Sequence, residues 1–456
     1  MLINKLDNVE VNLEDGHKYA RFDIKKGENV IKYGNPIGHA TADIKKGEHV
    51  HTHNVATNLS DNLEYTYAPV ESSLAAEPSE RTFLGYRRPD GKVGIRNDIW
   101  IVGTVGCVNK IAERLAALTG AFAFPHPFGC SQLGEDQEVT QKILAGMVHH
   151  PNAGGVLVLG LGCENNNIDV FKKVLGEVDP DRVKFLNCQE SEDEIADGVA
   201  LIEALRRNAE RTKREEIPIS ELCVGLKCGG SDGYSGITAN PLVGRFCDML
   251  IARGGSCMLT EVPEMFGAEH LLMERCVSRE IFQKNVALIN NFKDYYKRHD
   301  QVVYENPSPG NKKGGITTLE EKSLGCVQKG GSAPVVDVLD YGDTVRKKGL
   351  SLLNGPGNDL VAVTNLMAAG CHLILFTTGR GTPLGAPVPT VKVATNHALA
   401  ERKADWIDFD ASPVLAGEDI DNAFFDYVLS VASGAETKNE QHGYREISIF
   451  KDGVTL

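Results

Sequence analysis

Short apolar runs alternate with amphipathic stretches along most of the chain beyond residue 83. The runs Ile99–Val102, Val156–Leu159 and Val183–Leu186 are almost uninterrupted, which is typical of strands that are buried on both faces. Between such runs, apolar positions recur every three or four residues, which predicts helices. Alternation of this kind predicts α/β units built on parallel, doubly wound sheets. Further expected strands are Leu222–Leu226, Cys257–Thr260, His372–Phe376 and Glu446–Phe450, and expected helices are Asn109–Leu118, Glu192–Asn208, Pro241–Arg253, most of Phe266–Asp300, and Asn365–Ala369.

The N-terminal part has a different pattern, with an internal repeat. The sequence D-I-K-K-G-E occurs at Asp23–Glu28 and again at Asp43–Glu48, and a short β-like run follows each copy. A spacing of twenty residues is too short for two domains, so the repeat predicts one compact all-β unit.

These patterns divide the chain into four segments. We expect a small β unit over residues 1–68, an exposed linker over 69–82, an α/β domain over 83–305, and a C-terminal α/β domain with glycine-rich loops over 306–456.

Composition narrows the possible functions. The chain has 456 residues and a formal net charge of −14, so no basic surface dominates and a nucleic-acid partner is not expected. No apolar stretch approaches the roughly 20 residues of a membrane span, and the N-terminus lacks a signal pattern, so we expect a cytoplasmic protein with no membrane partner. The 11 cysteines are scattered, which predicts free thiols or metal ligands and not a disulfide framework.

The glycine-rich turn Leu226–Pro241 lies between a predicted strand and a helix expected to have Asn240 as its N-cap. Its glycines let the backbone approach a ligand closely, and amides beside a helix N-terminus favour an anion. We expect Gly229, Gly230 and Ser231 to bind substrate and Asp232 to take part in catalysis. The alternative is a tight connection that binds nothing.

Four cysteines each follow a predicted strand: Cys107, Cys130, Cys163 and Cys228. In open α/β sheets, ligands bind outside the carboxyl ends of the strands, so these loops could converge on one pocket. They also carry Asn109, Ser131, Gln132, Glu164, Asn165 and Asn166. The loops could form a polar substrate pocket, a metal site or an iron–sulfur site, or the cysteines could be small residues that suit crowded turns.

The segment H-V-H-T-H places His49, His51 and His53 at every second position, so on a strand they share one face. Neighbouring imidazoles can chelate a metal, and one could act as a general base. His17 could approach them if the small unit folds back. The alternative is an edge strand that faces solvent.

A loop beyond another predicted strand, Thr377–Thr382, carries Arg380 among glycines. A guanidinium suits a bidentate grip on a carboxylate, and Lys312 could close a loop over the same anion. No Walker A motif, dinucleotide-binding glycine pattern or G-x-S-x-G elbow occurs, so nucleotide and hydride chemistry are not indicated.

The chain resembles the altronate dehydratase family, whose sugar-acid hydro-lyases include galactarate dehydratase and whose wider membership includes the sulfolactate sulfo-lyases. The motifs that carry this resemblance extend along nearly the whole chain. They are G-H-K at Gly16–Lys18, G-E-H-V-H-x-H-N at Gly47–Asn54, T-V-G-C-V-N at Thr104–Asn109, G-C-S-Q-L-G at Gly129–Gly134, G-L-G-C-E-N-N at Gly160–Asn166, C-G-G-S-D-G at Cys228–Gly233, E-V-P-E-M-F-G-A-E at Glu261–Glu269, E-N-P-S-P-G-N-K at Glu305–Lys312, and T-G-R-G-T-P at Thr378–Pro383.

The resemblance implies a small N-terminal β-clip (SAF) domain followed by two doubly wound α/β units. It also implies a requirement for Fe²⁺, with Mn²⁺ as a possible substitute, and conversion of D-altronate to 2-dehydro-3-deoxy-D-gluconate and water. We expect a homo-oligomer, specifically a dimer. Galactarate or another sugar acid as substrate, and a sugar-acid binding protein without turnover, are the alternatives.

Matched motifs and chemistry together give the expected site. A metal would chelate the substrate while a base removes the C2 proton and the C3 hydroxyl leaves. The expected catalytic residues are His17, Lys18, Glu164 and Asp232; the expected substrate-binding residues are Asn109, Ser131, Gln132, Gly229, Gly230, Ser231, Lys312, Arg380 and Thr382; the expected metal ligands are His51, His53, Cys130, Cys163 and Cys228. A [4Fe–4S] cluster on Cys107, Cys130 and Cys163 is the alternative metal centre.

Overall fold

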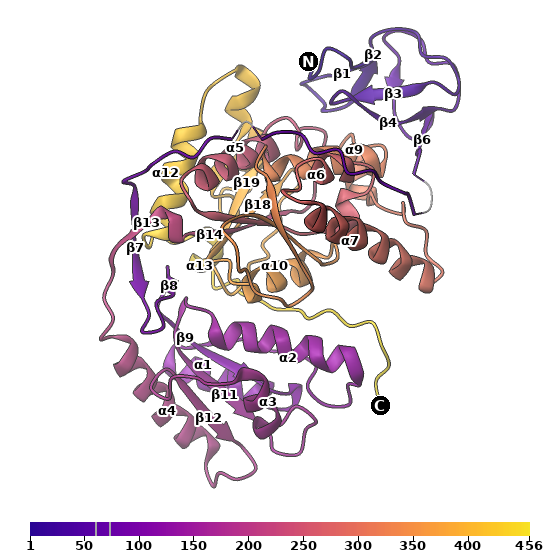
Figure 1. Ribbon diagram of the computed structural model, residues 1–456. Coiled ribbons are helices and arrows are strands. Elements are labelled where there is room, and N and C mark those ends of the chain that lie inside the picture. The colour runs from indigo at the N-terminus through magenta and orange to yellow at the C-terminus, as the bar shows by residue number, and fades with distance from the viewer. Residues whose placement is uncertain (60–61, 73) are drawn as a thin grey trace.

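The N-terminal segment forms two small antiparallel sheets in the computed structural model, which describes residues 1–59, 62–72 and 74–456 (Figure 1). One sheet contains β1 (Val9–Val11), β2 (Lys18–Ala20) and β5 (His49–Val50), and the other contains β3 (Asn29–Lys32), β4 (Asn35–Ala40) and β6 (Val55–Ala56). The predicted all-β unit is confirmed.

The sequence repeat explains how this unit closes. Ile24 and Ile44, at equivalent positions of the two copies, are buried and form an isolated antiparallel bridge. Around them the charges pair reciprocally, with Lys25 3.0 Å from Asp43 and Lys45 3.0 Å from Asp23. Both ion pairs are exposed, so the buried isoleucines contribute more to stability than the charges do.

A parallel sheet follows, with strand order β10-β9-β11-β12. Alternate residues of its central strands face opposite sides. Ile99 and Ile101 pack with α1 and α4, whereas Trp100 and Val102 pack with α2 and α3, so both faces are covered. The elements are β9 (Asp98–Gly103), α1 (Asn109–Thr119), β10 (Phe122–Ala123), α2 (Gly134–His149), β11 (Ala153–Gly160), α3 (Ile168–Leu175), β12 (Val183–Asn187) and α4 (Glu194–Ala209). A side sheet, ordered β13-β7-β8, contains β7 (Thr82–Arg87), β8 (Val93–Gly94) and β13 (Glu215–Pro218).

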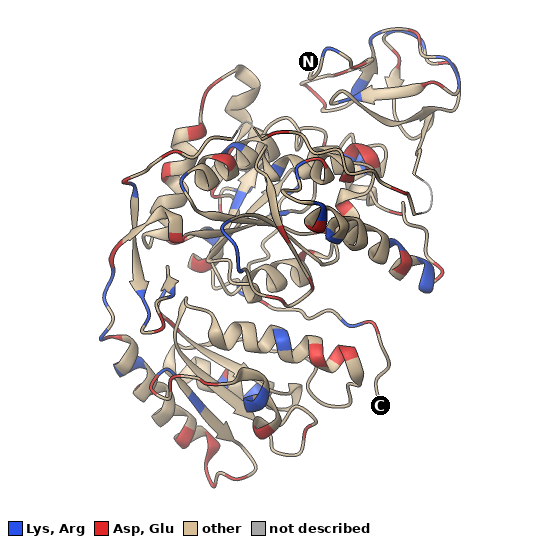
Figure 2. Cartoon of the chain, viewed as in Figure 1, with Lys and Arg blue, Asp and Glu red and all other residues tan. Residues whose placement is uncertain are grey.

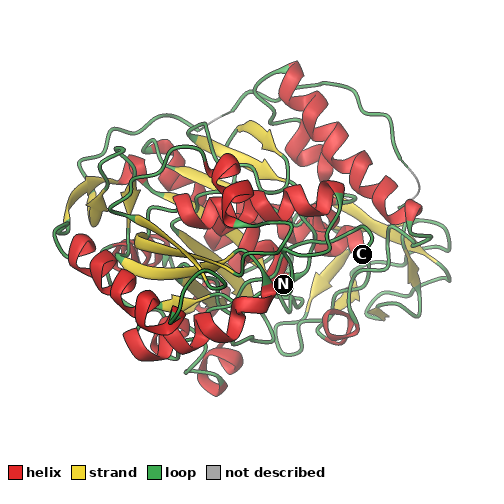
Figure 3. Cartoon of the chain, turned by 90° about the horizontal axis from the view of Figure 1, so that it is seen from below, coloured by secondary structure: helices red, strands yellow, loops and turns green. Residues whose placement is uncertain are grey.

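The largest sheet has seven parallel strands in the order β16-β17-β15-β14-β18-β19-β20. Its strands are β14 (Cys223–Cys228), β15 (Ser256–Leu259), β16 (Val335–Leu339), β17 (Gly349–Leu353), β18 (Leu373–Thr378), β19 (Thr390–Ala394) and β20 (Phe409–Asp410). Its helices are α5 (Ala239–Ala252), α6 (Glu269–Met273), α7 (Arg279–Arg298), α8 (Pro309–Lys313), α9 (Leu319–Cys326), α10 (Asp359–Ala368), α11 (His397–Arg402), α12 (Asp421–Ala432) and α13 (Lys438–Gln441). Helices lie on both sides of the strands (Figure 3), so the predicted fold class is confirmed.

Two expectations about the C-terminal half differ from the structure. The expected boundary between 305 and 306 falls inside the seven-stranded sheet, because β14 and β15 pair with strands from later in the chain. The two parallel sheets instead separate between β12 and β14. The expected strand Glu446–Phe450 is absent: the amides of Ser448 and Phe450 donate to the hydroxyls of Thr364 and Tyr341, so no neighbouring strand takes these bonds.

The two parallel-sheet units pack directly on each other through α2 and α10 (Figure 1). Lys and Arg residues are interspersed with Asp and Glu residues in all parts of the chain (Figure 2). Among the described residues, none of the helices combines the length and apolar character needed to cross a bilayer.

Candidate functional site

The central strand of the large sheet, β14, ends at Cys228 and has β15 on one side and β18 on the other. The chain order reverses its direction across the sheet here, since β15 follows β14 and β18 comes much later. Ligands of open α/β sheets bind in the crevice outside the carboxyl ends of the strands at such a point. The loops after β14, β15, β18 and β19 therefore form the candidate site.

Asp232 joins two of these loops, those after β14 and β19. It is buried, and its carboxylate accepts hydrogen bonds from Thr395 Oγ1 at 2.9 Å, Asn396 Nδ2 at 3.0 Å and Ser235 Oγ at 3.0 Å. Burial raises the pKa of Asp232 despite these bonds. Asp232 thus organises the predicted substrate loop, and its role in catalysis stays a prediction.

The predicted anion-binding groups of this loop lie next to each other. The amide of Gly379 donates to the carbonyl of Gly230 at 3.1 Å, which brings the Arg380 loop against the glycine turn. Gly230 has a φ of +65°, which a glycine adopts without strain. Arg380 is exposed and has no ion pair or hydrogen bond among the described residues, so its guanidinium is available to a ligand. The Thr382 hydroxyl accepts from the amide of Leu384 at 3.3 Å.

The small N-terminal unit docks on the same loops. A Cβ atom at Gly233 would lie 1.9 Å from the carbonyl oxygen of Gly16, so only glycine permits this approach. Lys18 and Lys32 are fully buried and each lies 2.8 Å from Glu321 of α9. Burial outweighs the attraction of Glu321 and lowers the pKa of Lys18 to about 8. Because Lys18 is enclosed in this ion pair, its contacts favour a docking role over the predicted catalytic one.

Pairing of β2 with β5 inside the small unit brings His17 to the other three histidines, as the sequence suggested. His17 Nδ1 and His49 Nε2 lie 3.0 Å apart, and the His17 and His51 ring centroids are 5.5 Å apart. His51 Nε2 lies 2.9 Å from the carbonyl oxygen of Lys312, so this nitrogen is already hydrogen-bonded. His53 is exposed, with its ring centroid 5.6 Å from that of His49. We call these four residues the histidine group.

Burial affects the protonation of two members of the histidine group, His49 and His51. It lowers the pKa of His49, and it lowers the pKa of His51 to about 4 with help from the nearby Lys18 ammonium. Both rings are therefore neutral at neutral pH, the form in which imidazole binds metals.

The predicted residues of the second domain lie on a different sheet. The loops that carry Cys107, Cys130 and Cys163 follow β9, β10 and β11 and are hydrogen-bonded to one another. The amide of Gly106 donates to the carbonyl of Phe128 at 2.9 Å, and the amide of Asn166 donates to the carbonyl of Gly129 at 3.0 Å. These three cysteines are exposed, whereas the other eight are buried. We call this edge the exposed rim.

The polar residues of the exposed rim mainly hold its loops. Glu164 accepts from the Thr104 hydroxyl at 2.6 Å and from two backbone amides; burial alone would raise its pKa, but these bonds lower it. Asn109 donates to the His126 carbonyl at 2.9 Å. The backbone carbonyl of Ser131 accepts a hydrogen bond from the amide of Leu456 at 2.9 Å. The side chain of Gln132 is buried and accepts a hydrogen bond from the amide of Gly129 at 3.2 Å.

The structure does not bring the five predicted metal ligands together. His51 and His53 belong to the small unit, Cys130 and Cys163 to the exposed rim, and Cys228 to the large sheet. All four cysteine loops were expected at one edge, but the strands before them belong to two different sheets, which local sequence does not reveal. Within the described part of the chain, the one group of three potential ligands with donor atoms inside 4.8 Å is Cys228, Glu264 and Cys326.

Cys228 of this cluster was a predicted metal ligand, but Glu264, Cys326 and the charges around them were not predicted. Cys228 Sγ lies 3.3 Å from Cys326 Sγ, and both sulfurs lie 3.2 Å from Glu264 Oε2. The hydrogen bond from Cys326, together with the Lys329 and Lys227 ammonium groups, lowers the pKa of Cys228 to about 6. The segments E-V-P-E-M-F-G-A-E and G-C-V-Q-K contain these residues, but their acids and lysines have no recognisable ligand spacing. We call the edge around Cys228 the buried rim.

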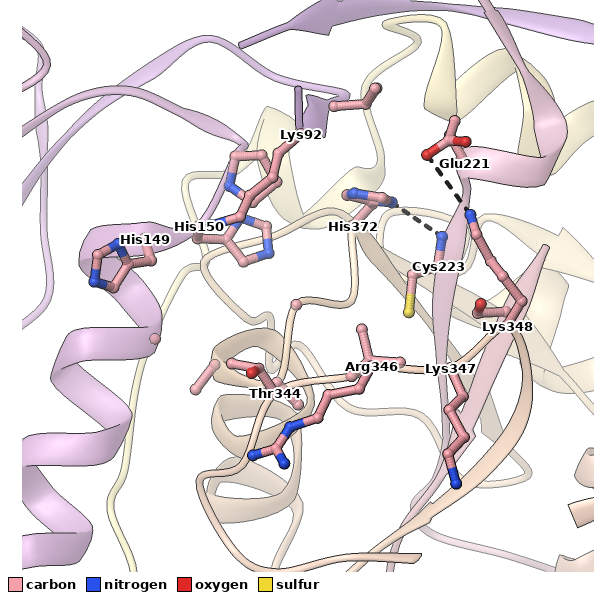
Figure 4. Close-up of a pocket in the computed structure, with 18 residues that line it drawn as sticks. Lys92, His149, His150, Glu221, Cys223, Thr344, Arg346, Lys347, Lys348 and His372 are labelled. Atoms are coloured by element: carbon pink, nitrogen blue, oxygen red, sulfur yellow. Dashed lines mark hydrogen bonds and ion pairs between the residues drawn. The ribbon is translucent and has the colours of Figure 1, made fainter. Parts of the chain in front are cut away.

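A cavity of about 320 Å³ lies at the opposite edge of the large sheet, between the two α/β units (Figure 4). It is lined by Lys92 and His150 from one unit and by Cys223, Arg346 and His372 from the other. Cys223 begins β14, so this cavity is at the amino ends of the strands, and none of the predicted site residues line it.

Three family models together match nearly the whole chain. They are "Altronate/galactarate dehydratase SAF domain" over residues 3–58, "D-galactarate dehydratase/Altronate hydrolase, second domain" over 85–210, and "D-galactarate/Altronate dehydratase, C-terminal" over 219–455. These ranges agree with the three structural parts described above.

Curated relatives match over almost their full lengths. The chain is 54% identical to an altronate dehydratase from Bacillus subtilis (strain 168), covering 98% of this chain and 93% of that protein. It is 53% identical to an altronate dehydratase from Escherichia coli (strain K12), covering 99% and 95%. A galactarate dehydratase (L-threo-forming) from the same strain is 34% identical, covering 96% and 90%.

Proposed function

Because the chain belongs to the altronate and galactarate dehydratase family, we propose that it is a hydro-lyase that converts D-altronate to 2-dehydro-3-deoxy-D-gluconate and water. The observation that carries this proposal is the identity of 53–54% to two altronate dehydratases, against 34% to a galactarate dehydratase. The coverage is nearly complete in all three comparisons, so the difference applies to the whole chain.

The buried rim supplies the groups that this reaction needs for its substrate. Loss of the C2 proton builds negative charge on the carboxylate, and the C3 hydroxyl then leaves with a proton as water. Arg380 can hold the carboxylate, because its guanidinium has no partner in the part of the chain that the structure describes and its side chain lies beside the glycine turn. The amides of Gly230 and Ser231 add fixed dipoles that favour the same anion, whereas the Gly229 amide donates to the carbonyl of Thr377 at 3.0 Å.

We propose that iron binds at the histidine group, with Mn²⁺ as a possible substitute. The facing nitrogens of His17 and His49, 3.0 Å apart, fit two donors to a single ion. When bound, such an ion stabilises negative charge on the substrate oxygens. This choice differs from the predicted His51 and His53 pair, because His51 Nε2 is hydrogen-bonded to Lys312.

The exposed rim offers a second location for iron. Its three thiols are the exposed ones among the 11 cysteines, and they lie on loops that are hydrogen-bonded to each other. Three cysteines are enough to hold an iron–sulfur cluster that keeps one iron open to substrate. Acid-labile sulfide and visible absorption in anaerobically purified protein would favour this location; iron without sulfide would favour the histidine group.

We further propose a cytoplasmic location and a homodimer. The first fits an enzyme that acts on a sugar acid, and the second can be measured by light scattering of the purified protein.

The proposed reaction is tested by a direct assay. Purified protein loaded anaerobically with Fe²⁺ is given D-altronate, galactarate and other sugar acids, and the 2-keto-3-deoxy product is quantified. We expect turnover with altronate at least tenfold above that with galactarate. Faster turnover of galactarate would reassign the substrate, and tight binding of altronate without any product would support a binding protein.

A further inference from the structure

Three donor atoms meet beneath the glycine turn, and the reaction proposed above assigns them no role. Cys228 ends β14, Glu264 lies in the 3₁₀ turn Val262–Met265, and Cys326 ends α9. All three side chains are buried, with 1–5% of each residue exposed. The three donor–donor distances are 3.2, 3.2 and 3.3 Å, so the atoms form a nearly equilateral triangle.

This triangle has the size and chemistry of a metal-ligand set. Thiolates and a carboxylate bind Zn²⁺ at about 2.3 Å and 2.0–2.2 Å, so ligands of one ion are separated by roughly 3–4 Å. Two sulfurs and one oxygen favour a thiophilic divalent ion over Mg²⁺ or Ca²⁺. The two sulfur atoms are also well beyond bonding distance, so the pair is not a disulfide.

Neighbouring lysines orient the three donor atoms, as the residues that hydrogen-bond to metal ligands do in known metal sites. Lys322 Nζ lies 2.8 Å from Glu264 Oε1, which leaves Oε2 directed at the two sulfurs. Lys329 Nζ donates to Cys228 Sγ at 3.0 Å. Ligands of bound metals are usually fixed by such second contacts, which set the direction of the donor lone pairs.

Three lysines enclose the triangle. Lys227 and Lys329 form ion pairs with Glu261, and Lys322 forms one with Glu264. A divalent ion bound by two thiols displaces their protons as the thiolates form, so binding adds little net charge to this buried region.

We propose that Cys228, Glu264 and Cys326 bind one thiophilic divalent cation, with Zn²⁺ as the reference ion. The ion ties together the loop after β14, the turn after β15 and the end of α9. It thereby supports the glycine turn from below. This site is separate from the iron proposed at the histidine group and does not depend on the substrate.

Metal content and a cobalt spectrum test the site directly. Full-length protein is incubated with Zn²⁺, passed through a desalting column and analysed by mass spectrometry for metal per chain; a second sample receives Co²⁺ in its place. Beyond any Zn²⁺ held by the histidine group, we expect about one tightly held Zn²⁺ per chain, and a near-ultraviolet thiolate-to-cobalt absorption band. Cys326→Ser should lose both, whereas Cys276→Ser, a buried cysteine outside the cluster, should keep both.

Several results would overturn the proposal. They are wild-type protein that retains no Zn²⁺, a Co²⁺ spectrum without the thiolate band, and retention of the full Zn²⁺ content by Cys326→Ser. A native mass lighter by two hydrogens, with a Cys228–Cys326 disulfide in the peptide map, would do the same. The wild-type spectrum decides the matter even if Cys326→Ser does not fold. Failure to dehydrate altronate would refute the proposed function and leave this site untouched.

Discussion

The two rims place cysteines by the same rule but in opposite surroundings. In both, a thiol follows a parallel strand at the carboxyl edge of a sheet. At the exposed rim, Cys107, Cys130 and Cys163 face solvent, and hydrogen bonds between backbone groups and to Glu164 hold their loops. At the buried rim, Cys228 and Cys326 are enclosed by lysines and glutamates. Topology therefore decides where a thiol lies, whereas burial and neighbouring charge decide its chemistry.

The largest expected effect is on stability at the buried rim. Lys329→Met removes a buried cation and leaves Glu261 and Cys228 without it, so the free energy of unfolding should fall by about 3–5 kcal/mol. Urea unfolding followed by circular dichroism measures this. The matched change at the exposed rim, Cys163→Ser, should alter it by less than about 0.5 kcal/mol. Equal effects at both rims would contradict the contrast.

The second prediction concerns the free energy of unfolding at acid pH. Burial alone would raise the pKa of Glu321, but Lys18 and Lys32 lower it from 4.5 to about 2. The native carboxylate therefore stabilises the fold above pH 4.5, and this contribution is lost as the pH falls from 4.5 towards 2. The difference in free energy of unfolding between wild type and Glu321→Gln should decrease by about 3 kcal/mol as the pH falls from 4.5 to 2, since one pKa unit equals about 1.4 kcal/mol. Urea unfolding at a series of pH values measures it. Asp43→Asn, at an exposed ion pair, serves as the control and should show no such decrease.

A third change tests the anion grip of the buried rim. Arg380→Met should lower kcat/KM for altronate by about 100-fold, because the developing charge on the carboxylate loses its guanidinium partner. Steady-state kinetics measures this. Arg402→Met, at an exposed arginine of α11, should leave kcat/KM within about twofold of wild type. A loss of similar size in both variants would mean that Arg380 has no special position.

The smallest expected effect is on the reactivity of the exposed and buried thiols. In native protein freed of metal by a chelator, a thiol-specific disulfide reagent should react rapidly with the three exposed cysteines and with all 11 only after denaturation. Cys228 should remain protected although its pKa is lowered to about 6, because burial excludes the reagent. Rapid labelling of Cys228 or Cys326, identified by peptide mapping, would show that the buried rim opens.

Much of the fold followed from local patterns. The runs Ile99–Val102 and Val156–Leu159 became β9 and β11, because strands covered on both faces must be apolar throughout. Strand pairing did not follow, since nothing local in β14 or β15 indicates that their neighbours come after residue 306. The predicted N-cap Asn240 lies inside α5, where it bonds Thr377 and Gly325 across the core.

The site was predictable only where each contributing segment has a recognisable pattern of its own. The glycine turn and Arg380 lie side by side, as the carboxyl-edge rule predicts, and His17 meets His49. Glu264 and Cys326 were missed because neither lies in a segment with a recognisable ligand pattern, and packing alone brings them together. Such a cluster has no spacing that a single sequence can reveal.

The repeat of the N-terminal unit divides attachment and ligand binding between its two copies. Aligning the two copies sets Lys32 and Tyr33 of the first against Thr52 and His53 of the second. The first copy buries Lys32 against Glu321 and so holds the unit in place, while the second carries His51, whose ring is hydrogen-bonded to the carbonyl of Lys312. The repeated turn therefore has two roles: its first copy attaches the unit to α9, and its second copy provides the histidines. Substitutions in the first copy should shift the histidines without contacting them.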